Sequence, residues 1–516
     1  MKNIVKTLIK LRKIFDSRIL ILGVSLILQV VVIVYFTNYI TGLSTPLTNI
    51  INFTIRVLAI LIIIAILNKH NNPTFNIMWC IIICTIPIVG VMLYVFMGNR
   101  QVGSSLQRNQ LKQLIDNEEV LTQDNDLEEL FDNDSVKLQY DYLKTVYFPY
   151  YKNTNSKYFS SGDEFYPNFL KDLKSAEHFI FLEFFIITDG RVWNETYEIL
   201  KQKAKEGVKV CLIYDDAGCV DSLGKSFNKQ ALEDNIHVVT FNPLRPRLII
   251  TMNNRDHRKL VIVDNKIGYT GGCNLADEYI NEKKLFGHWK DSMIRIEGDA
   301  VWNMTVMFIQ FFNAITKEEK LDYFDYKFDN NIESDSLVLP FSDSPSDHED
   351  ASRTVHLNMI NKAQKYIYIT TPYLVTDYDM EVALTSAAKQ GVDVRIITPH
   401  IPDKPYVFAI TRSNYEFLVK GGVKIYEYTP GFIHAKDFIS DDSIALVGTI
   451  NMDYRSYYMH FEDGILMNDK NTIKNMKEEY FKTLDVSHQM TLDELDNQSA
   501  VSKIVRAVLN VFALMM

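Results

Sequence analysis

The sequence predicts an α/β protein with two similar domains, related by a pseudo-two-fold axis and preceded by N-terminal transmembrane helices. Three observations lead to this prediction. The first 100 residues contain long uncharged apolar runs, two later stretches repeat the same order of strand-like and helix-like segments, and one polar motif occurs once in each stretch. Strand–helix–strand order implies parallel pairing within an α/β layer.

The N-terminal region is predicted to enter the membrane. A helix needs about 20 apolar residues to cross a bilayer core, and three runs come near that length. We therefore expect a transmembrane region over 19–97 with two or three helices, whose candidates are 19–40, 51–67 and 77–97.

The direction of crossing is left open by the sequence. Residues 1–18 are basic, which favours a cytoplasmic start under the positive-inside rule. Three full crossings would place the rest of the chain outside the cell. If one run is re-entrant or merely interfacial, the rest lies inside; Pro87 and Gly90 in the third run and Arg56 in the second leave that open.

The charge is unevenly divided along the chain. The net charge is −10; the first 100 residues hold nine basic residues and one acid, a net of +8, so the remainder carries −18. An acidic body disfavours a nucleic-acid binder, whose affinity comes from neutralising phosphates with Lys and Arg. Five cysteines are too few for a disulfide framework, and an odd number cannot all pair; no Cys/His spacing matches a zinc site.

An internal repeat organises the rest of the chain. Each copy begins with a β-rich apolar run, continues with an amphipathic helix that ends at a glycine, and returns as a strand; the copies begin at His178 and Tyr366. Residues 486–516 form a tail whose segment Val501–Met516 is predicted to be amphipathic, either lying in the membrane interface or docked on the body. The expected divisions are an acidic linker at 98–150, a first domain at 151–335 and a second at 336–485.

The motif in each copy is HxKxxxxD, followed by a Gly-containing turn and an Asn. Residues i and i+2 of a strand share a face, so the His and Lys of each copy point the same way. An imidazole beside an ammonium suits attack on a phosphoryl group, because the ring is a nucleophile and the cation holds the non-bridging oxygens. The candidate catalytic residues are His257, Lys259, Asp264, His434, Lys436 and Asp441.

Two further assignments follow from the same spacing. Asp264 and Asp441 have the opposite parity to their His partners, so within the motif we interpret them as structural, at the turns that follow. Asn274 and Asn451 return after one hairpin, where an amide can donate to a substrate phosphate oxygen. No metal is expected, since a Lys on the same face as the His repels a dication.

These residues make the chain resemble the phospholipase D superfamily and, within it, the bacterial cardiolipin synthases. The twin HxKxxxxD signature is specific for the superfamily, and the resemblance spans nearly the whole chain. His460 departs from it, standing where an Asn usually precedes Phe461 and Glu462, and Cys273 occupies a variable position. The subfamily match rests on Pro87–Gly98, Asn254–Tyr279, His288–Val301, Ile369–Asp377 and Gly431–Lys436.

The resemblance implies two phospholipase D-like domains that form one active site without a metal or other cofactor. One His would attack the phosphodiester of phosphatidylglycerol and form a covalent phosphatidyl-histidine, releasing glycerol. The other would protonate the leaving group and then activate a second phosphatidylglycerol, so that cardiolipin forms. The resemblance also implies that an acid orients the His of its own half: Asp291 for His257 and Glu462 for His434.

Other functions stay open at this point. A phospholipase D-type hydrolase, or a phosphatidyltransferase that uses another alcohol, has the same motifs, while a nuclease or a non-enzymatic scaffold is disfavoured. The expected partners are phosphatidylglycerol and the lipid bilayer, with no nucleic acid, and the expected location is the bacterial cell membrane with several crossings. The order of the two histidines, the oligomeric state and the acyl-chain preference are not settled by the sequence.

Overall fold

The computed structural model describes residues 46–69, 73–98 and 134–496, except 225, 245–252, 317–319 and 348, as well as residues 31, 35, 39, 106, 120, 121 and 131. The predicted span 19–40, apart from three single residues, and the predicted helix Val501–Met516 lie outside the described residues. The chain divides into two units: residues up to Gln101 with the loop Asn242–Asn254, and a body of Val102–Phe241 and Arg255–Leu514.

The described residues of the first unit include the apolar helices α3 (Pro46–Leu67), α4 (Pro73–Thr85) and α5 (Pro87–Met97). Within α3, the stretch Asn49–Leu67 is the one helix among the described residues that is long and apolar enough to cross a membrane. It covers the second predicted run.

The third predicted run is not one straight helix. The chain turns at Ile86, where Pro87 has no N–H to continue the helical hydrogen bonds, and α5 folds back beside α4. The rings of Trp79 and Tyr94 consequently lie 5.3 Å apart. With 13 and 11 residues, each helix is about 20 Å long or less, too short to cross a hydrocarbon core of about 30 Å. The candidate 77–97 is therefore not one helix but falls on two short helices, α4 and α5.

The body contains two mixed sheets with the same strand order. The first runs β1-β8-β6-β5-β2-β3-β4, and the second runs β9-β18-β16-β15-β10-β12-β13 with β19 added at its edge. In each, three neighbouring strands are parallel and the others antiparallel. The predicted α/β class and its duplication are confirmed. The first sheet is β1 (Thr154–Phe159), β2 (Phe179–Phe184), β3 (Lys209–Asp215), β4 (Ile236–Phe241), β5 (Leu260–Val263), β6 (Ile267–Gly271) and β8 (Met293–Gly298). The second is β9 (Val338–Asp343), β10 (Tyr366–Thr370), β12 (Asp393–Pro399), β13 (Lys424–Tyr428), β15 (Asp437–Ser440), β16 (Ile444–Gly448), β18 (Glu462–Met467) and β19 (Ser487–Gln489).

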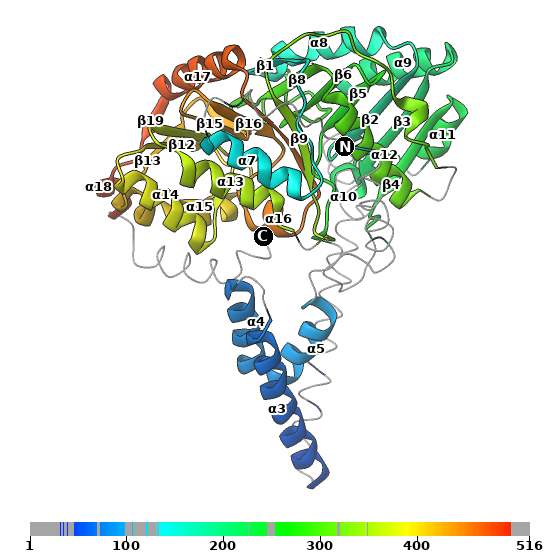
Figure 1. Ribbon diagram of the computed structural model, residues 1–516. Helices are drawn as coiled ribbons and strands as arrows, with labels where there is room; N and C mark the ends of the chain where they lie inside the picture. The colour runs from blue at the N-terminus through cyan, green and yellow to red at the C-terminus, as the bar shows by residue number, and fades with distance from the viewer. Residues whose placement is uncertain are drawn as a thin grey trace, which may run out of the picture. The chain divides into compact units, whose positions relative to one another are not determined.

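Helices follow the same repeat. In the two halves, which lie side by side in Figure 1, α8 and α9 of the first correspond to α13 and α14 of the second. A hydrophobic core shared by both halves packs α12 and α17 against strands of both sheets. The helices of the first half are α8 (Gly162–Lys174), α9 (Arg191–Lys205), α10 (Asp216–Cys219), α11 (Phe227–Glu233) and α12 (Val301–Ile315). Those of the second are α13 (Ala351–Lys362), α14 (Tyr378–Lys389), α15 (Pro405–Lys420), α16 (Tyr454–Tyr458), α17 (Lys470–Asp485) and α18 (Leu492–Asp496).

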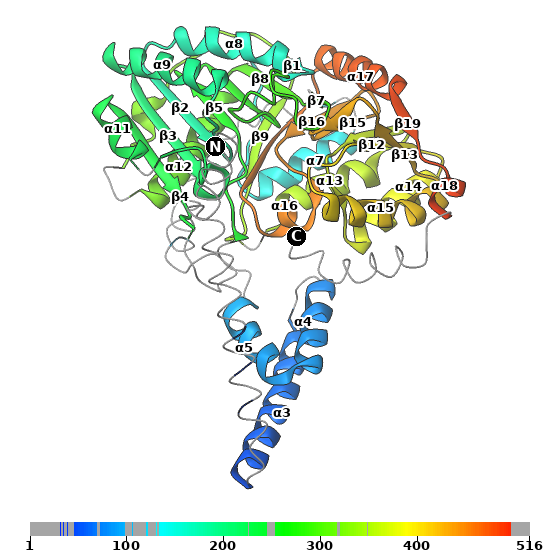
Figure 2. The same cartoon turned by 180° about the vertical axis from the view of Figure 1, so that it is seen from behind.

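Backbone pairing crosses between the halves at two related places. Strand β7 (His288–Lys290) of the first half pairs in parallel with β14 (Gly431–Ile433) of the second, and Figure 2 shows β7 against the second half. Asp256 forms the matching bridge with Phe461. Each half therefore holds the segment that leads into the other half's motif.

The end of the predicted linker is a helix rather than a solvated connection. Helix α7 (Asp134–Thr145) packs on α13, and the buried Tyr140 donates a hydrogen bond from its hydroxyl to the carbonyl oxygen of Leu337 at 3.1 Å. The predicted linker 98–150 therefore includes a helix that packs on the second half.

Candidate active site

Both motif histidines lie at the start of a central strand. His257 precedes β5 and His434 precedes β15, and each strand sits between the parallel and antiparallel parts of its sheet. The backbone N–H of His257 donates to the carbonyl oxygen of Phe461 at 2.9 Å, and the backbone N–H of His434 donates to the carbonyl oxygen of Lys290 at 2.7 Å. Each histidine is thus positioned by the opposite half.

The carboxylate that holds each ring also comes from the opposite half. Nδ1 of His257 lies 2.9 Å from Oε2 of Glu462, and Nδ1 of His434 lies 2.8 Å from Oδ2 of Asp291. The expectation that each acid orients the histidine of its own half is therefore wrong. The reason is the crossed backbone pairing, which places the residue after Lys290 beside His434 and the residue after Phe461 beside His257. Such crossing requires that both motif copies share one interface.

The two carboxylates have different further partners. Glu462 accepts hydrogen bonds from the hydroxyls of Thr449 at 2.6 Å and Ser456 at 2.7 Å. Asp291 instead accepts from the indole N–H of Trp289 at 3.2 Å and from the backbone N–H of Ser292 at 2.9 Å. These four partners were not singled out from the sequence, because nothing in their spacing marks them as neighbours of a carboxylate.

The two motif lysines are buried and point into the same interface. The ammonium of Lys259 donates to the carbonyl oxygen of His257, and that of Lys436 donates to the carbonyl oxygen of His434. Burial lowers the pKa of Lys259 to about 7 and that of Lys436 to about 8. The charge of Lys436 also contributes to lowering the pKa of Lys259. An ammonium has three protons, so each retains two for an anion.

Burial also controls the charge of the histidines. It lowers the pKa of His257 well below the usual 6.5, although Glu462 raises it. Burial and Lys436 lower the pKa of His434 to about 4, against the effect of Asp291. Both rings are therefore neutral near pH 7 when nothing is bound. A bound phosphodiester would raise both pKa values, because an anion favours the charged form of its neighbours.

The aspartates of the motif serve the fold instead of the site. The Asp264 carboxylate accepts three backbone N–H groups from residues 177–179 at 2.7–2.8 Å. Asp441 does the same with residues 364–366 at 2.7–2.9 Å. Both have positive φ, at the turn after their strand. Their inclusion among candidate catalytic residues is corrected by this geometry, while their interpretation as turn residues agrees with it.

The two candidate phosphate-binding amides are buried but differ in their contacts. Asn274 accepts the backbone N–H of Ile186 at 3.0 Å and donates to the hydroxyl of Tyr279 at 2.6 Å. The side-chain oxygen of Asn451 is buried and has no hydrogen-bond partner among the described residues. The ring of Tyr279 lies 5.8 Å from that of His434, so this tyrosine, which the sequence did not indicate, belongs to the same interface.

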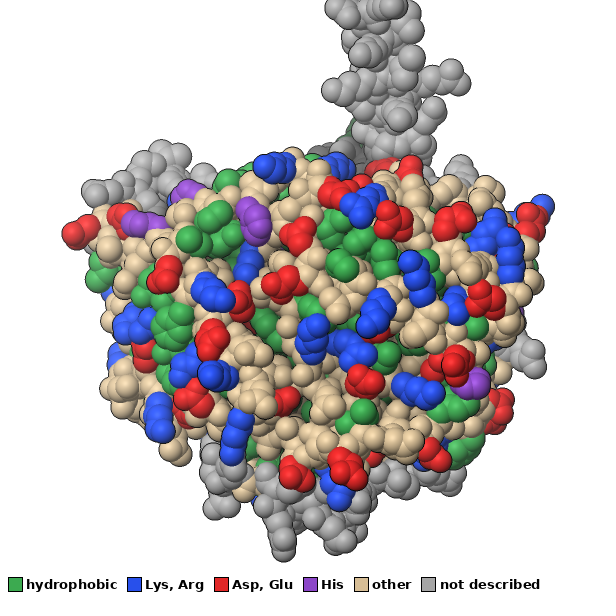
Figure 3. Space-filling view, turned by 90° about the horizontal axis from the view of Figure 1, so that it is seen from above, with side chains coloured by type: hydrophobic (Ala, Val, Ile, Leu, Met, Phe, Trp, Pro, Cys, Tyr) green, Lys and Arg blue, Asp and Glu red, His purple; other side chains and the backbone are tan. Residues whose placement is uncertain are grey.

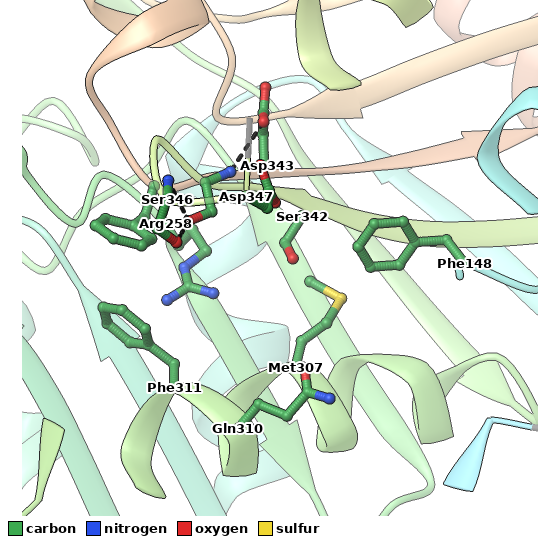
Figure 4. Close-up of a pocket in the computed structure, with 11 residues that line it drawn as sticks. Phe148, Arg258, Met307, Gln310, Phe311, Ser342, Asp343, Ser346 and Asp347 are labelled. Carbon is green, nitrogen blue, oxygen red and sulfur yellow. Dashed lines mark hydrogen bonds between the residues drawn. The ribbon is translucent and has the colours of Figure 1, made fainter. Parts of the chain in front are cut away.

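A separate cavity of about 50 Å³ lies on the opposite face of the motif strand (Figure 4). Arg258 alternates with His257 and Lys259, so its side chain points the other way, and its guanidinium lies 4.1 Å from the ring centre of Phe311. Asp343 and Asp347 also line this cavity. It is not the place where the paired histidines lie.

The surface of the body carries both signs of charge. On the face that includes α8 and α17, Lys and Arg side chains are interspersed with Asp and Glu (Figure 3). This face has no broad basic track of the kind that binds a nucleic-acid backbone.

Comparison with known proteins follows the same division of the chain. Residues 169–296 and 356–484 match the family described as "Cardiolipin synthase, PLD-like domain", and residues 57–99 match the family described as "Phospholipase_D-nuclease N-terminal". The first two ranges run from before β2 into β8 and from before β10 to beyond β18, and they include all four motif histidine and lysine positions.

Individual relatives are similar over most of their length. The chain is 37% identical to an uncharacterized protein of Streptococcus mutans, over 87% of this chain and 98% of that one. It is 31% identical to a cardiolipin synthase of Halalkalibacterium halodurans, over 86% and 89%. Among solved structures, a phosphatidylserine synthase of Haemophilus influenzae superposes with a TM-score of 0.57 at 15% identity, covering 74% of this chain and 98% of that one. The last likeness concerns the fold alone.

Proposed function

The chain belongs to the cardiolipin synthase family of the phospholipase D superfamily, and on that premise we propose that it makes cardiolipin and glycerol from two molecules of phosphatidylglycerol. The observation that supports this most is the crossed pairing of His257 with Glu462 and of His434 with Asp291, which gives one buried site two oriented imidazoles. The reaction exchanges one phosphodiester for another, so it needs no nucleotide or redox cofactor.

In the first step, Nε2 of His257 attacks the phosphorus of phosphatidylglycerol. Nδ1 of that ring faces Glu462, which fixes the tautomer that keeps a lone pair on Nε2. His434 is protonated once the anionic substrate has raised its pKa, and the bond from phosphorus to the glycerol oxygen breaks as Nε2 of His434 gives its proton to that oxygen. Glycerol leaves and a phosphatidyl-histidine remains. Lys259 and Lys436 hold the non-bridging oxygens, and Asn274 and Asn451 donate to them.

In the second step, His434 is neutral and acts as a base. It takes the proton from the terminal hydroxyl of a second phosphatidylglycerol, and that oxygen attacks phosphorus as the bond to His257 breaks. Cardiolipin leaves and His434 carries its proton again, so the protons balance over the cycle. Asp291 stabilises the imidazolium in both steps, as a triad carboxylate does.

Water competes with the second lipid for the intermediate. Burial of both histidines and both lysines limits the entry of water, and tethering to the bilayer concentrates a two-tailed alcohol beside the site. These two features favour transfer over hydrolysis.

The decisive experiment supplies the purified full-length protein with phosphatidylglycerol vesicles alone and analyses the products. Equal amounts of cardiolipin and glycerol support the proposal. Phosphatidic acid with glycerol, and no cardiolipin, would identify a hydrolase instead. Product that forms only when another alcohol is added would identify a different phosphatidyltransferase.

For location, we propose a multi-pass protein of the bacterial cell membrane. The run 19–40 and helix α3 supply two crossings, and the α4–α5 hairpin is re-entrant because neither helix is long enough to cross. Two crossings return the chain to the side of its basic N-terminus, so the body is cytoplasmic. A reporter active only outside the cell, fused after residue 496, should be silent; activity would indicate a third crossing.

A further inference from the structure

A third imidazole lies beside the pair formed by His257 and Glu462. His460 is 8% exposed, and its ring centre is 5.5 Å from that of His257. Its Nδ1 is 3.5 Å from Oε1 of Glu462, and among the described residues neither of its ring nitrogens completes a hydrogen bond. A buried imidazole whose Nε2 has no partner and whose Nδ1 makes only a long ion pair is costly unless something else binds it.

The three side chains together offer a recognisable set of metal ligands. One ligand atom each from His257, His460 and Glu462 lie within 4.8 Å of one another. Two imidazoles and one carboxylate are a ligand set that Zn²⁺ takes in proteins, with a fourth position left open. Zn–N and Zn–O distances of about 2.0–2.2 Å separate two tetrahedral ligand atoms by about 3.4 Å, so Nδ1 of His257 and Oε2 of Glu462, which are 2.9 Å apart, must open slightly, while the widest separation in the cluster, up to 4.8 Å, must shorten.

Among the residues that the structure describes, the pair of His434 and Asp291 has no matching set. Trp289 corresponds to His460. Each lies two residues before the carboxylate that holds a histidine, Asp291 or Glu462, and one residue before the carbonyl that accepts the N–H of that histidine. An indole is a donor only and binds no cation through its nitrogen. The extra ligand therefore distinguishes one histidine–carboxylate pair from the other.

We infer that His257, His460 and Glu462 form a binding site for Zn²⁺ or a similar transition-metal ion, and that the bound ion inhibits the enzyme. The ion takes the position between Nδ1 of His257 and Glu462, so the ring proton moves from Nδ1 to Nε2. A protonated Nε2 has no lone pair with which to attack phosphorus. The inhibition rests on the proposed role of His257, whereas the binding does not.

Neighbouring charges limit the affinity. The ammonium of Lys259 lies near His257 and repels a cation, while Glu462 must share its oxygens with the hydroxyls of Thr449 and Ser456. The site therefore binds a metal reversibly and more weakly than a structural zinc site, as an inhibitory site requires.

Binding is measured first, without reference to turnover. Full-length protein in detergent is titrated with Co²⁺, whose visible d–d bands report nitrogen ligands in a site of low coordination number. We expect one Co²⁺ per chain, displaced by Zn²⁺. In His460→Asn the half-saturating concentration should rise at least about tenfold, because losing even an outer-shell partner typically costs about 10–100-fold in metal affinity.

The matched control is His488→Asn, which removes an exposed imidazole that contacts one carboxylate, Glu494, at 2.8 Å. Its Co²⁺ spectrum should equal that of the unmodified protein. Unchanged Co²⁺ binding in His460→Asn, or loss of binding in His488→Asn, would overturn the site.

Inhibition is measured next, with cardiolipin formation in each variant compared with that variant's own metal-free rate. Zn²⁺ should inhibit the unmodified protein, a chelator should restore it, and His460→Asn should require at least about tenfold more Zn²⁺. Both proteins are assayed with the same amount of anionic lipid, so metal bound by the lipid lowers the free Zn²⁺ equally in the two assays. Equal Zn²⁺ sensitivity in both proteins would refute the inhibition. Failure of the metal-free protein to make cardiolipin would refute the proposed function and leave the Co²⁺ result standing.

Discussion

The crossed pairing of histidine and carboxylate predicts which step of the reaction each carboxylate supports. Pairing within each half would predict the opposite assignment. In Asp291→Asn the carboxylate beside His434 is lost, and in Glu462→Gln the carboxylate beside His257 is lost. With His257 as nucleophile, Glu462→Gln should impair formation of the covalent intermediate. Asp291→Asn should impair proton transfer to the leaving group and from the incoming alcohol.

The expected loss is large for both variants. Each carboxylate is fully buried and fixes the tautomer of its histidine through Nδ1. Replacing such a carboxylate by its amide in a serine-protease triad lowers turnover about 10⁴-fold, or about 5 kcal/mol of transition-state stabilisation. Turnover on phosphatidylglycerol alone cannot separate the two roles, because both variants become slow.

An activated substrate separates them. A phosphatidyl ester of p-nitrophenol releases a phenolate that needs no proton, so the general acid becomes dispensable in the first step. Asp291→Asn should then give a burst of about one nitrophenolate per protein and accumulate phosphohistidine, since its second step still lacks a proper base. Glu462→Gln should give no burst. Ser456→Ala, which removes one hydroxyl from Glu462 and leaves His257 in place, is the control and should keep the burst.

The outcome that refutes the crossed arrangement is the reverse pattern, with a burst in Glu462→Gln and none in Asp291→Asn. Mapping the labelled histidine by mass spectrometry guards against an exchange of roles between His257 and His434. The crossed arrangement makes the same demand for either assignment. If His257 carries the phosphatidyl group, Asp291→Asn must still form the labelled intermediate; if His434 carries it, Glu462→Gln must still form it.

Three other substitutions test separate parts of the structure. Asp264→Ala removes a carboxylate that accepts three backbone N–H groups and should lower the free energy of unfolding by about 3–5 kcal/mol in denaturant titration; an unchanged midpoint would contradict its role in the turn. Burial lowers the pKa of His356 from 6.5 to about 3. As the pH falls, this histidine is therefore protonated in the unfolded chain before it is protonated in the folded protein. The free energy of unfolding consequently decreases by up to about 5 kcal/mol between pH 6.5 and pH 3. His356→Gln should lose this part of the acid sensitivity, as followed by circular dichroism. In Gly272→Ala the new Cβ would lie 1.8 Å from a carboxylate oxygen of Asp291, so kcat should fall about 100-fold; the matched Thr449→Ala should cost less than about tenfold, and equal losses would refute the steric argument.

The duplicated fold could be predicted because the repeat is local. A strand, a helix ending at glycine, a second strand and an HxKxxxxD motif recur in the same order, and each of these features is set by residues that are near one another in the chain. The parity argument on a strand also separated His257 and Lys259 from Asp264, and the geometry agrees.

The crossed carboxylates could not be predicted on the same grounds. Asp291 follows His257 closely in sequence, yet it binds His434, which is 143 residues away. Which half faces which motif is decided by the pairing of β7 with β14, and that pairing leaves no periodic signal in either strand. The resemblance to the family identified Asp291 and Glu462 correctly as the carboxylates that orient the histidines, but it assigned each of them to the wrong histidine.

The ends of the linker and the third apolar run show a different limit. Val136, Tyr140 and Leu143 are buried and have the spacing of one helix face, but the acidic and Asn-rich composition before them led us to assign the whole stretch to a linker. In the third run, Pro87 marked a possible interruption, but the apolar length did not show that the chain turns at Ile86 and forms two helices. Composition averaged over a long segment therefore does not locate a short helix or a turn within it.

Crossing also determines when during synthesis the protein acquires activity. Glu462 is made 205 residues after the histidine that it holds, so a ribosome must finish nearly the entire chain before either imidazole is fully oriented. A product terminated before Glu462 would lack the carboxylate of His257 and would be chemically inert. The membrane is thereby protected from fragments of an enzyme that breaks phosphodiesters.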